Sequence, residues 1–328
     1  MLNAAIVGMG RWGQILVRSV LGKSDKLCFT RGVTRTVEKA ETFGRETGIS
    51  VSNDLGSVLN DPEIDFIVLA TPHSQHGEQI KLAAAAGKHV LCEKPLTLRT
   101  QDARDAFAAC AKNNVLLGVA QNRRFLPSVQ KLKTMIDDGT LGTVLHFEAN
   151  FSGGSGYRFE KSPDGWRAND TESPAGSMTG RGLHMTDLMI YLSSTVKTVS
   201  AFSQRRVLNI PMDDTTALLM HFEDGATGYL GSLGVTGEQW RFACYASKGW
   251  AELRGHETLA ICLIGDKERT ETFCDFDIER AELEAFVDAI EGRLNYPVTA
   301  EQAINNIAIL EALLQSAKSG TFVSTTDF

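Results

Sequence analysis

The sequence predicts an α/β protein in two parts, a parallel sheet flanked by helices and then an α+β part with a largely antiparallel sheet. Three observations support this prediction. A short apolar run at residues 4–7 breaks into a glycine-rich turn, and a helical pattern follows it. Apolar runs and helical patterns then alternate as far as residue 121, as they do in βαβ units. After residue 143, short strand-like runs follow one another across brief turns, which is typical of antiparallel pairing.

The first part contains short apolar runs that we expect to be strands buried on both faces. Helical patterns lie between them, and Gly48 and Gly87 follow two of these patterns, where glycine commonly ends a helix. We expect strands at residues 4–7, 27–33, 66–70, 89–92 and 115–119, and helices that begin after Gly13 and that span 37–47, 76–86 and 100–113.

The second part begins near Asn122, where the alternation of strands and helices stops. Residues 144–151 alternate like a strand with one wet face, and a polar loop follows at 152–174. We expect further strands at 198–204, 217–222, 227–233, 241–246, 251–253 and 259–264, and helices at 128–138, 185–192, 280–291 and 300–318. The chain therefore divides into predicted domains of residues 1–121 and 122–328.

Bulk composition excludes several classes of protein. The 328 residues carry a net charge of -7 and their basic residues are scattered, so we expect no nucleic-acid partner. No apolar run approaches the roughly 20 residues of a membrane span and no secretory leader is evident, so we expect no membrane association and a cytoplasmic location. The six cysteines lie far apart without a C-x-x-C pair, which is typical of reduced thiols.

The glycine-rich turn has the spacing G-x-G-x-x-G at Gly8, Gly10 and Gly13, with Arg11 and Trp12 between the last two. In a strand-turn-helix unit the first glycine permits the tight turn, the second lets the backbone approach a pyrophosphate, and the third lets helix and strand pack closely. The helix start directs free N–H groups at that pyrophosphate. The sequence therefore predicts a dinucleotide-binding Rossmann domain whose cofactor contacts this turn.

The end of the second predicted strand bears on which dinucleotide is used. After residues 27–33 the chain reads Thr34-Arg35-Thr36, with no acidic residue. A site that selects NAD usually places Asp or Glu here to bind the ribose hydroxyls, whereas a guanidinium between hydroxyls suits a 2′-phosphate. We predict that NADP(H) is bound in preference to NAD(H), with Thr34 and Arg35 as ligands. The alternative is that Arg35 stacks on the adenine and the protein does not discriminate.

Other candidate ligands follow the next strand, because ligands bind beyond the carboxyl ends of parallel strands. Thr71 and Pro72 come directly after the strand at 66–70, and we place His76 near the cofactor as well. His73 and His76 have a spacing seen in metal sites, but no carboxylate or thiolate completes a ligand set. We therefore predict no metal.

Five motifs occur together in the chain, at residues 8–13, 70–72 with His76, 87–96, 122–125 and 182–187. In this order they resemble the glucose-fructose oxidoreductase, inositol dehydrogenase and MocA family (Gfo/Idh/MocA), over nearly the whole chain. The resemblance implies a Rossmann domain followed by an open-faced sheet domain, and NAD(P)-dependent hydride transfer at a carbinol or carbonyl carbon. It also implies a small polyol, sugar or related hydroxy compound as substrate, and homodimers or homotetramers that pack through the C-terminal sheet.

The motif Glu93-Lys94-Pro95 is the most specific part of the resemblance. Lys94 is the first candidate for catalysis, because at the sheet edge where the nicotinamide is expected an ammonium can bind a substrate oxygen while alkoxide charge develops. Glu93 and Lys94 are also candidates for cofactor binding, and Glu93 can pair with Lys94 and hold it charged. The alternative is an ordinary solvated lysine.

His184 is the second candidate for catalysis and for substrate binding. It stands in a helical pattern one turn before Asp187, whose carboxylate can orient the imidazole to take or give the substrate proton. Many members of the family carry an acid one turn before this histidine, where the present chain has Gly180. Either Lys94 and His184 suffice, or another group such as Asp187 assists, or the protein is a cofactor-binding sensor or regulator without turnover.

Three arginines are candidates for binding a substrate carboxylate or phosphate, because a guanidinium recognises such groups through two hydrogen bonds at once. Each of them has the alternative of being a solvated surface residue. The three are Arg124, Arg167 and Arg181.

Overall fold

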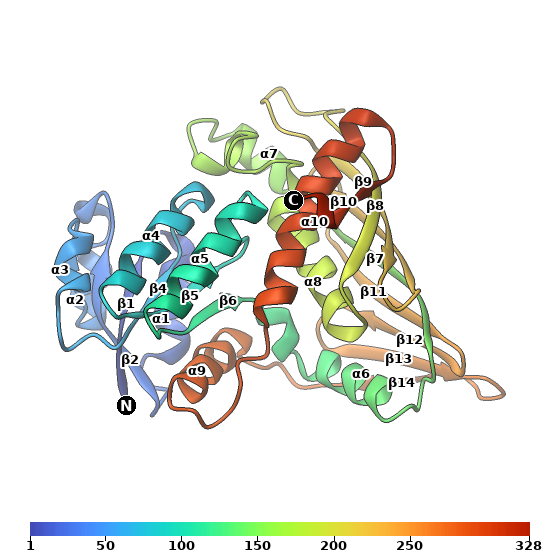
Figure 1. Cartoon of the computed structure of the whole chain (residues 1–328), viewed down its shortest axis with the longest axis horizontal. Coiled ribbons are helices and arrows are strands. Elements are labelled where there is room, and N and C mark those ends of the chain that lie inside the picture. The colour runs from blue at the N-terminus through green and yellow to red at the C-terminus, as the bar shows by residue number, and fades with distance from the viewer. The chain divides into compact units, whose positions relative to one another are not determined.

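The computed structural model describes residues 1–328. The chain forms two compact units. The first comprises Met1–Thr97, Gln101–Asn122 and Asp277–Ala300, and the second comprises Leu98–Thr100, Arg123–Phe276 and Glu301–Phe328 (Figure 1). One unit holds a parallel sheet and the other a mostly antiparallel sheet, so the predicted α/β fold class is confirmed.

The first unit is built on a six-stranded sheet in which every strand pair is parallel. The strands are β1 (Leu2–Val7), β2 (Leu27–Val33), β3 (Ser50–Ser52), β4 (Phe66–Leu69), β5 (His89–Glu93) and β6 (Leu117–Ala120). The apolar strand β4 is buried on both faces, as a central strand covered by helices must be. The strand order β3-β2-β1-β4-β5-β6 reverses between β1 and β4, so their carboxyl ends mark the position where such sheets bind ligands.

The helices of this unit are α1 (Arg11–Val20), α2 (Glu41–Thr47), α3 (Leu55–Leu59), α4 (His73–Ala85), α5 (Thr100–Lys112) and α9 (Ile278–Ile290). The sequence prediction lacks β3 and α3, because elements of three and five residues give no readable periodicity. Helix α4 begins at His73, earlier than the predicted start at His76, directly after the extended residue Pro72.

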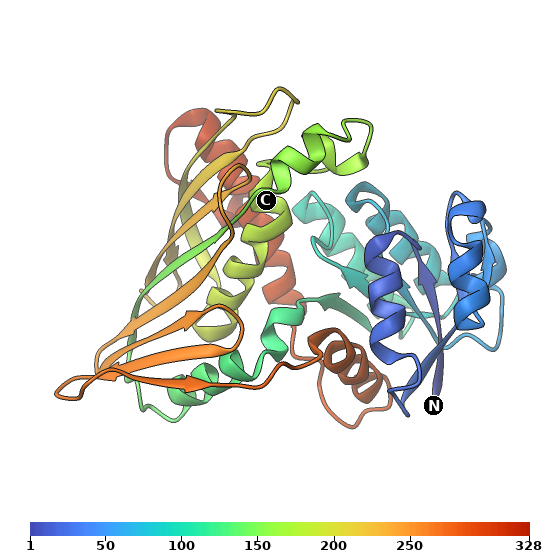
Figure 2. The same ribbon diagram turned by 180° about the vertical axis from the view of Figure 1, so that it is seen from behind.

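Helix α9 groups with the first unit, whereas the predicted boundary assigns all of residues 122–328 to a second domain. Its Phe286 is fully buried and packs edge-on against Phe66 of β4, with 5.6 Å between the ring centroids. Its Asp288 forms an ion pair with Lys26 at 2.8 Å. Figure 2 shows α9 beside α1. The change of sequence pattern near Asn122 therefore does not reveal that a later segment returns to the first sheet.

The second unit is built on a nine-stranded sheet of order β14-β13-β12-β11-β7-β10-β9-β8-β15. Only β10 and β7 pair in parallel, and the other pairs are antiparallel. The strands are β7 (Val144–Ser152), β8 (Val196–Gln204), β9 (Thr215–Phe222), β10 (Thr227–Leu233), β11 (Gln239–Ala246), β12 (Gly249–Arg254), β13 (Thr258–Leu263), β14 (Arg269–Thr272) and β15 (Val323–Ser324).

One face of this sheet is covered by helices and the other is open. The helices are α6 (Pro127–Asp137), α7 (Ser155–Glu160), α8 (Leu183–Leu192) and α10 (Ala300–Ser319). Figures 1 and 2 show α6, α8 and α10 on the same side of the sheet and no helix on the opposite side. Helix α7 lies within the residues predicted to be a loop. The sequence prediction missed it, because six residues that include glycine give no helical pattern.

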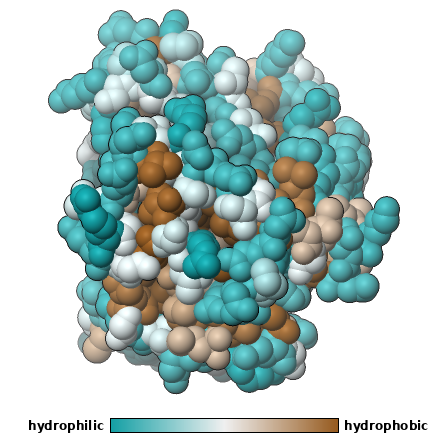
Figure 3. Space-filling view, turned by 90° about the vertical axis from the view of Figure 1, so that its left-hand side faces the viewer, coloured by the Kyte–Doolittle hydropathy of each residue, from teal (hydrophilic) through white to brown (hydrophobic).

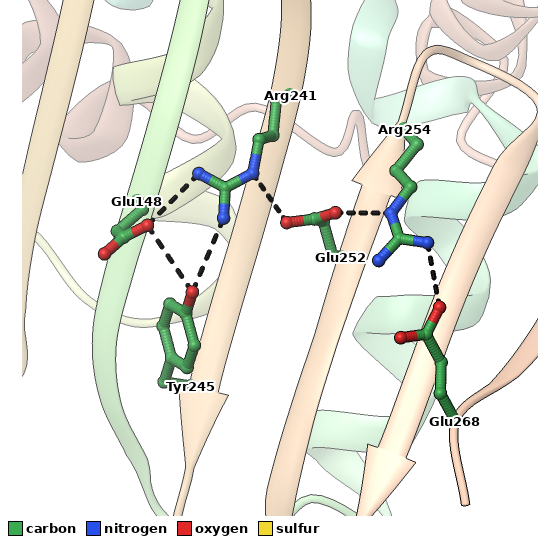
Figure 4. A network of polar contacts seen from close by, with 6 residues as sticks. All are labelled: Glu148, Arg241, Tyr245, Glu252, Arg254 and Glu268. Atoms are coloured by element: carbon green, nitrogen blue, oxygen red, sulfur yellow. Dashed lines mark hydrogen bonds and ion pairs between the residues drawn. The ribbon is translucent and has the colours of Figure 1, made fainter.

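The open face carries a network of charged side chains on β7, β11 and β12 (Figure 4). Arg241 bridges two carboxylates, with Nη1 donating to Glu148 at 3.1 Å and Nε donating to Glu252 at 2.6 Å. The chain of contacts continues from Glu252 through Arg254 to Glu268 and also includes Tyr245. Alternating charges thus compensate one another along this half of the face.

The other half of the open face carries three large apolar side chains that are exposed on neighbouring strands. Leu219 of β9 lies directly opposite Tyr229 of β10, and Phe202 of β8 lies diagonally from Leu219. All three side chains are exposed, Phe202 to 75%. We call Phe202, Leu219 and Tyr229 the apolar strip.

Figure 3 shows one further face of the molecule. This face is mostly hydrophilic, and hydrophobic side chains gather in its centre and along its lower part. No helix in the structure combines the length and the apolar composition that crossing a bilayer requires.

Candidate functional site

The turn after β1 is shaped by two glycines that have no room for a side chain. Gly8 has φ of +101°, and a Cβ there would lie 2.5 Å from the carbonyl of Ala70 at the end of β4. A Cβ on Gly13 would lie 2.1 Å from the carbonyl oxygen of Gly8. Because both obstacles are backbone atoms, side-chain movement cannot relieve them. The turn therefore packs tightly against β4 and the start of α1.

Gly10, by contrast, borders open space, since a Cβ there would meet no atom within 4 Å. It is also the N-cap of α1, and no side chain caps this helix end. The first N–H groups of α1 are therefore free to bind an anion, as the pyrophosphate of a dinucleotide requires. Arg11 and Trp12 follow on the first turn, exposed and half-buried respectively. The turn fits the dinucleotide predicted for it.

The residues that directly follow β2 are Thr34, Arg35 and Thr36, none of them acidic. Thr34 is half-buried and its N–H donates to the carbonyl oxygen of Ser52 at 2.9 Å, which fixes the backbone there. Arg35 is exposed. Glu38 lies farther on, exposed, within a 3-10 helix at Val37–Lys39.

The Glu93-Lys94-Pro95 motif is connected to the glycine turn through its glutamate. Trp12 donates its indole N–H to Oε1 of Glu93, and the backbone N–H of Lys94 donates to Oε2 of Glu93 at 3.2 Å. The Lys94–Pro95 peptide bond is cis. The carboxylate of Glu93 therefore links the first turn of α1 to the backbone that carries Lys94.

His76 connects two strand ends from a fully buried position. Its Nδ1 lies 3.0 Å from the carbonyl oxygen of Pro95, and its Nε2 lies 3.1 Å from the carbonyl oxygen of Thr71. The ring thereby bridges the predicted cofactor ligands after β4 and the Lys94 loop after β5. Its neighbour His73 lies edge-on to it, with 5.9 Å between the centroids. The structure groups no three His, Cys, Asp or Glu side chains as metal ligands.

In the second unit, His184 lies in the first turn of α8 and is buried. A π-helical turn at Met178–Gly182 directly precedes this helix. The imidazole of His184 packs against Phe151, with 6.3 Å between the centroids. His184 is therefore held on the helix-covered side of the sheet.

Asp187 is engaged by an arginine that the sequence did not suggest as its partner. Arg124 donates from Nε and Nη2 to the two carboxylate oxygens of Asp187, at 2.8 and 2.7 Å. Burial raises the pKa of the Asp187 carboxyl, and the adjacent guanidinium opposes that rise. Asp187, which the sequence offers as a group that can orient His184, thus uses both of its carboxylate oxygens to bind Arg124.

Arg124, a candidate for binding substrate, also contacts other side chains of its own unit. Its side chain is fully buried, Nη1 donates to Gln302 at 2.8 Å, and the guanidinium stacks on Tyr191 at 4.7 Å from the ring centroid. All three nitrogens of the guanidinium thus donate to side chains of the same unit. Arg124 therefore acts as a structural anchor for α8 and α10.

The other two candidate arginines are nearer the surface. Arg167 is exposed and stacks on Trp166, 3.8 Å from the ring centroid. Arg181 donates from Nη1 and Nη2 to the two carboxylate oxygens of Glu238, at 2.7 and 3.1 Å. The hydrogen bonds from Arg181 lower the pKa of Glu238. Sequence reasoning missed Glu238, because no motif or helical spacing connects it to Arg181.

Gly180, where many relatives are expected to carry an acid, also borders open space. A Cβ there would meet no atom within 4 Å. The backbone of the π-helical turn therefore does not itself require glycine at this position.

A parallel sheet with a glycine turn at its order reversal, followed by a unit with an open nine-stranded sheet, defines a two-unit dinucleotide-binding protein of the Rossmann class. The chain belongs to the Gfo/Idh/MocA family. Residues 2–121 match the family model described as "Oxidoreductase family, NAD-binding Rossmann fold", and residues 129–252 match the model of the GFO/IDH/MocA C-terminal domain. The predicted family is confirmed.

Named relatives and solved structures extend the comparison. The chain is 30% identical to scyllo-inositol 2-dehydrogenase (NAD(+)) of Bacillus subtilis, covering 69% of this chain and 66% of the relative. It is 25% identical to scyllo-inositol 2-dehydrogenase (NADP(+)) IolW of the same organism, covering 97% and 94%. The solved levoglucosan dehydrogenase, in complex with NADH and levoglucosan, superposes with a TM-score of 0.90 at 21% identity, covering 99% of both chains.

The matches do not always extend over whole proteins. The chain spans about half the length of several curated relatives that it matches, among them an uncharacterised oxidoreductase of Schizosaccharomyces pombe (31% identical, 60% of this chain and 52% of the relative).

A substitution at Gly10 should weaken cofactor binding without changing the stability of the fold. Gly10→Val places its side chain in the open space above the turn, so we expect dinucleotide binding to weaken by at least about 100-fold, while the free energy of unfolding changes by less than about 0.5 kcal/mol. Fluorescence titration with reduced nicotinamide cofactor and urea unfolding measure the two effects. The control is Gly13→Ala, whose Cβ meets backbone and which should destabilise the fold by about 1–3 kcal/mol. Undiminished titration of folded Gly10→Val would contradict the assignment.

Proposed function

We propose that the protein is an NAD(P)-dependent oxidoreductase that moves a hydride between the nicotinamide and a carbinol or carbonyl carbon of a small polyol, sugar or related hydroxy compound. One observation supports this proposal most directly. Glu93 accepts hydrogen bonds from Trp12 and from the backbone of Lys94, and so connects the glycine turn, whose N–H groups can bind an anion, to the Lys94 loop. The names of relatives that act on inositols, and of a structural neighbour that binds levoglucosan, support the substrate class.

Lys94 and His184 have different roles in this reaction. The bound nicotinamide supplies or accepts the hydride. The ammonium of Lys94 binds the substrate oxygen and stabilises the negative charge that develops on it. The imidazole of His184 takes the hydroxyl proton in oxidation and returns it in reduction. Lys94 belongs to the first unit and His184 to the second. Each role is proposed from the chemistry of the side chain itself, an ammonium in Lys94 and an imidazole in His184.

A sensor or regulator that binds the cofactor without turnover is the second candidate. Gly180 is the observation that favours it, because the family's usual acid is missing there and the local backbone has room for one. A panel of sugars, polyols and aldehydes, scored by the absorbance of the reduced nicotinamide, separates the two functions. If no substrate is found and Gly180→Asp creates activity, the sensor is the better description.

Turnover should depend on both candidate catalytic residues. We expect Lys94→Ala and His184→Ala each to lower kcat on a substrate found by screening by about 10²- to 10⁴-fold, because each group acts on charge or a proton in the transition state. Cofactor affinity, measured by titration, should change little. Exposed Lys81→Ala on α4 serves as the matched control. Near-normal kcat in both variants would refute the assignment.

We also propose that NADP(H) is preferred over NAD(H). The exposed Arg35 and the hydroxyl of Thr34 suit a 2′-phosphate, and Glu38 lies beyond the strand end. Relatives named for each of the two cofactors occur, so the preference depends on this chain's own residues.

Arg35→Asp tests that preference directly. The change replaces a cation that pairs with phosphate by an anion that repels it, so the ratio of NADPH to NADH affinity should fall on the order of 10- to 100-fold. Titrations with both cofactors at one ionic strength measure the ratio, and Lys39→Asp on the neighbouring 3-10 helix controls for charge alone. Equal affinities of the unmodified protein for both cofactors would defeat the proposal.

The proposed assembly is a homodimer or homotetramer that packs through the open sheet face. The apolar strip exposes three large side chains on adjacent strands, as a surface that binds another protein often does. A stable interface buries about 800 Å² of accessible surface on each partner, so the contact would have to extend beyond the strip over the sheet face. The charged network on the same face offers alternating carboxylates and guanidinium groups that a second copy can meet.

Charges placed on the apolar strip should dissociate such an assembly. We expect the double variant Phe202→Glu and Leu219→Glu to sediment as a monomer at protein concentrations where the unmodified chain is a dimer or tetramer, because four carboxylates would have to be buried in each contact. Sedimentation velocity measures the state. Leu294→Glu changes a comparably exposed leucine in the first unit and should have no effect. A monomeric unmodified chain would end the proposal.

A further inference from the structure

Arg181 and Glu238 form an ion pair in which each side chain uses its full fork. Two guanidinium nitrogens meet the two carboxylate oxygens, at 2.7 and 3.1 Å. Arg181 is mostly covered, with 19% of its side chain exposed, whereas Glu238 is 71% exposed. The carboxylate therefore covers the guanidinium and faces solvent itself.

The backbone at Gly153 makes room for this pair. A Cβ on Gly153 would lie 2.3 Å from Nη1 of Arg181 and 2.4 Å from Oε1 of Glu238. The adjacent N–H of Gly154 donates to the same carboxylate at 3.4 Å, and the carbonyl oxygen of Ser152 accepts from Arg181 at 2.7 Å. The ion pair thus contacts the backbone at three consecutive residues, 152–154.

The pair lies beside the candidate catalytic histidine of the same unit. Arg181 lies in the π-helical turn three positions before His184. Phe151 contacts both, with the guanidinium 5.1 Å from its ring centroid and the imidazole ring centroid at 6.3 Å. A substrate that reaches His184 therefore approaches a cation that a carboxylate of this chain already neutralises.

Competition for Arg181 favours the protein's own carboxylate. A substrate carboxylate would have to displace Glu238, which is tethered and so competes at an effective concentration on the order of millimolar or higher. The exposed Glu238 also repels an approaching anion. Its outward lone pairs can instead accept hydrogen bonds from the hydroxyl groups of a neutral ligand.

We propose that the Arg181–Glu238 pair selects neutral polyhydroxy compounds over carboxylate-bearing ones. This selection rests on the proposed function, in which the His184 region of the second unit contacts the substrate. It replaces the earlier interpretation of Arg181 as a ligand for an acidic substrate, since the guanidinium becomes available to one only when Glu238 is removed.

Sorbitol and gluconate test the proposal, because they differ in charge at one terminal carbon. Calorimetric titration of the full chain, saturated with reduced cofactor, gives the ratio of gluconate to sorbitol affinity. In Glu238→Ala this ratio should rise about tenfold or more, because the two-point fork of Arg181 becomes free. Glu238→Gln keeps the shape and should raise the ratio in the same direction. Glu238 is largely exposed, so both variants should fold.

The control is the double variant Glu238→Ala with Arg181→Met. If the freed guanidinium causes the higher ratio of gluconate to sorbitol affinity, the double variant must return to the ratio of the unmodified protein. An unchanged ratio in Glu238→Ala, no gluconate binding by that variant, or a gain that survives in the double variant would each overturn the proposal. These titrations require no turnover. A shifted ratio without hydride transfer on any substrate would instead count against the proposed function alone.

Discussion

The first unit depends on direct contact between backbone segments at Gly8 and Gly13. These two positions bring the end of β1 against Ala70 and the start of α1 against the turn, at distances that exclude any side chain. The contact fixes where the N-terminus of α1 points, and hence where its unpaired N–H groups can meet a phosphate. It also fixes the start of the segment that leads from β4 into Thr71. Cofactor geometry in this unit thus follows from the packing of backbone on backbone.

Two side chains extend that constraint to Lys94. His76 joins the carbonyl oxygens of Thr71 and Pro95, and Trp12 holds the carboxylate that receives the N–H of Lys94. The lysine backbone is therefore held from both sides of the sheet order reversal. In the second unit a comparable role falls to Arg124, which fastens Asp187 of α8 and Gln302 of α10. Preorganisation of this kind lowers the cost of binding and of reaction, because the groups need not be ordered afterwards.

Much of the fold could be predicted from local pattern, and much less of the site could. The glycine turn and the alternating apolar strands are read from neighbouring residues, since each depends on short-range geometry. Asp187 shows the limit: its helical spacing from His184 is visible, but the arginine that takes both of its oxygens lies 63 positions away. Glu238 likewise lies 57 positions from Arg181. Such pairings depend on which strands and loops meet in space, and single-sequence periodicity carries no information about that.

The return of α9 to the first sheet has a consequence for the order of folding. Phe286 fills the space against Phe66 and over Gly118, where a Cβ would lie 2.8 Å from its ring. During synthesis the first strands leave the ribosome long before Asp277–Ala300 is made, so the growing chain holds an uncovered apolar surface while most of the second unit is translated. Domains usually fold in the order of their synthesis. Here the earlier unit is completed late, and chaperone binding to the nascent chain would have its target on the face that Phe286 eventually covers.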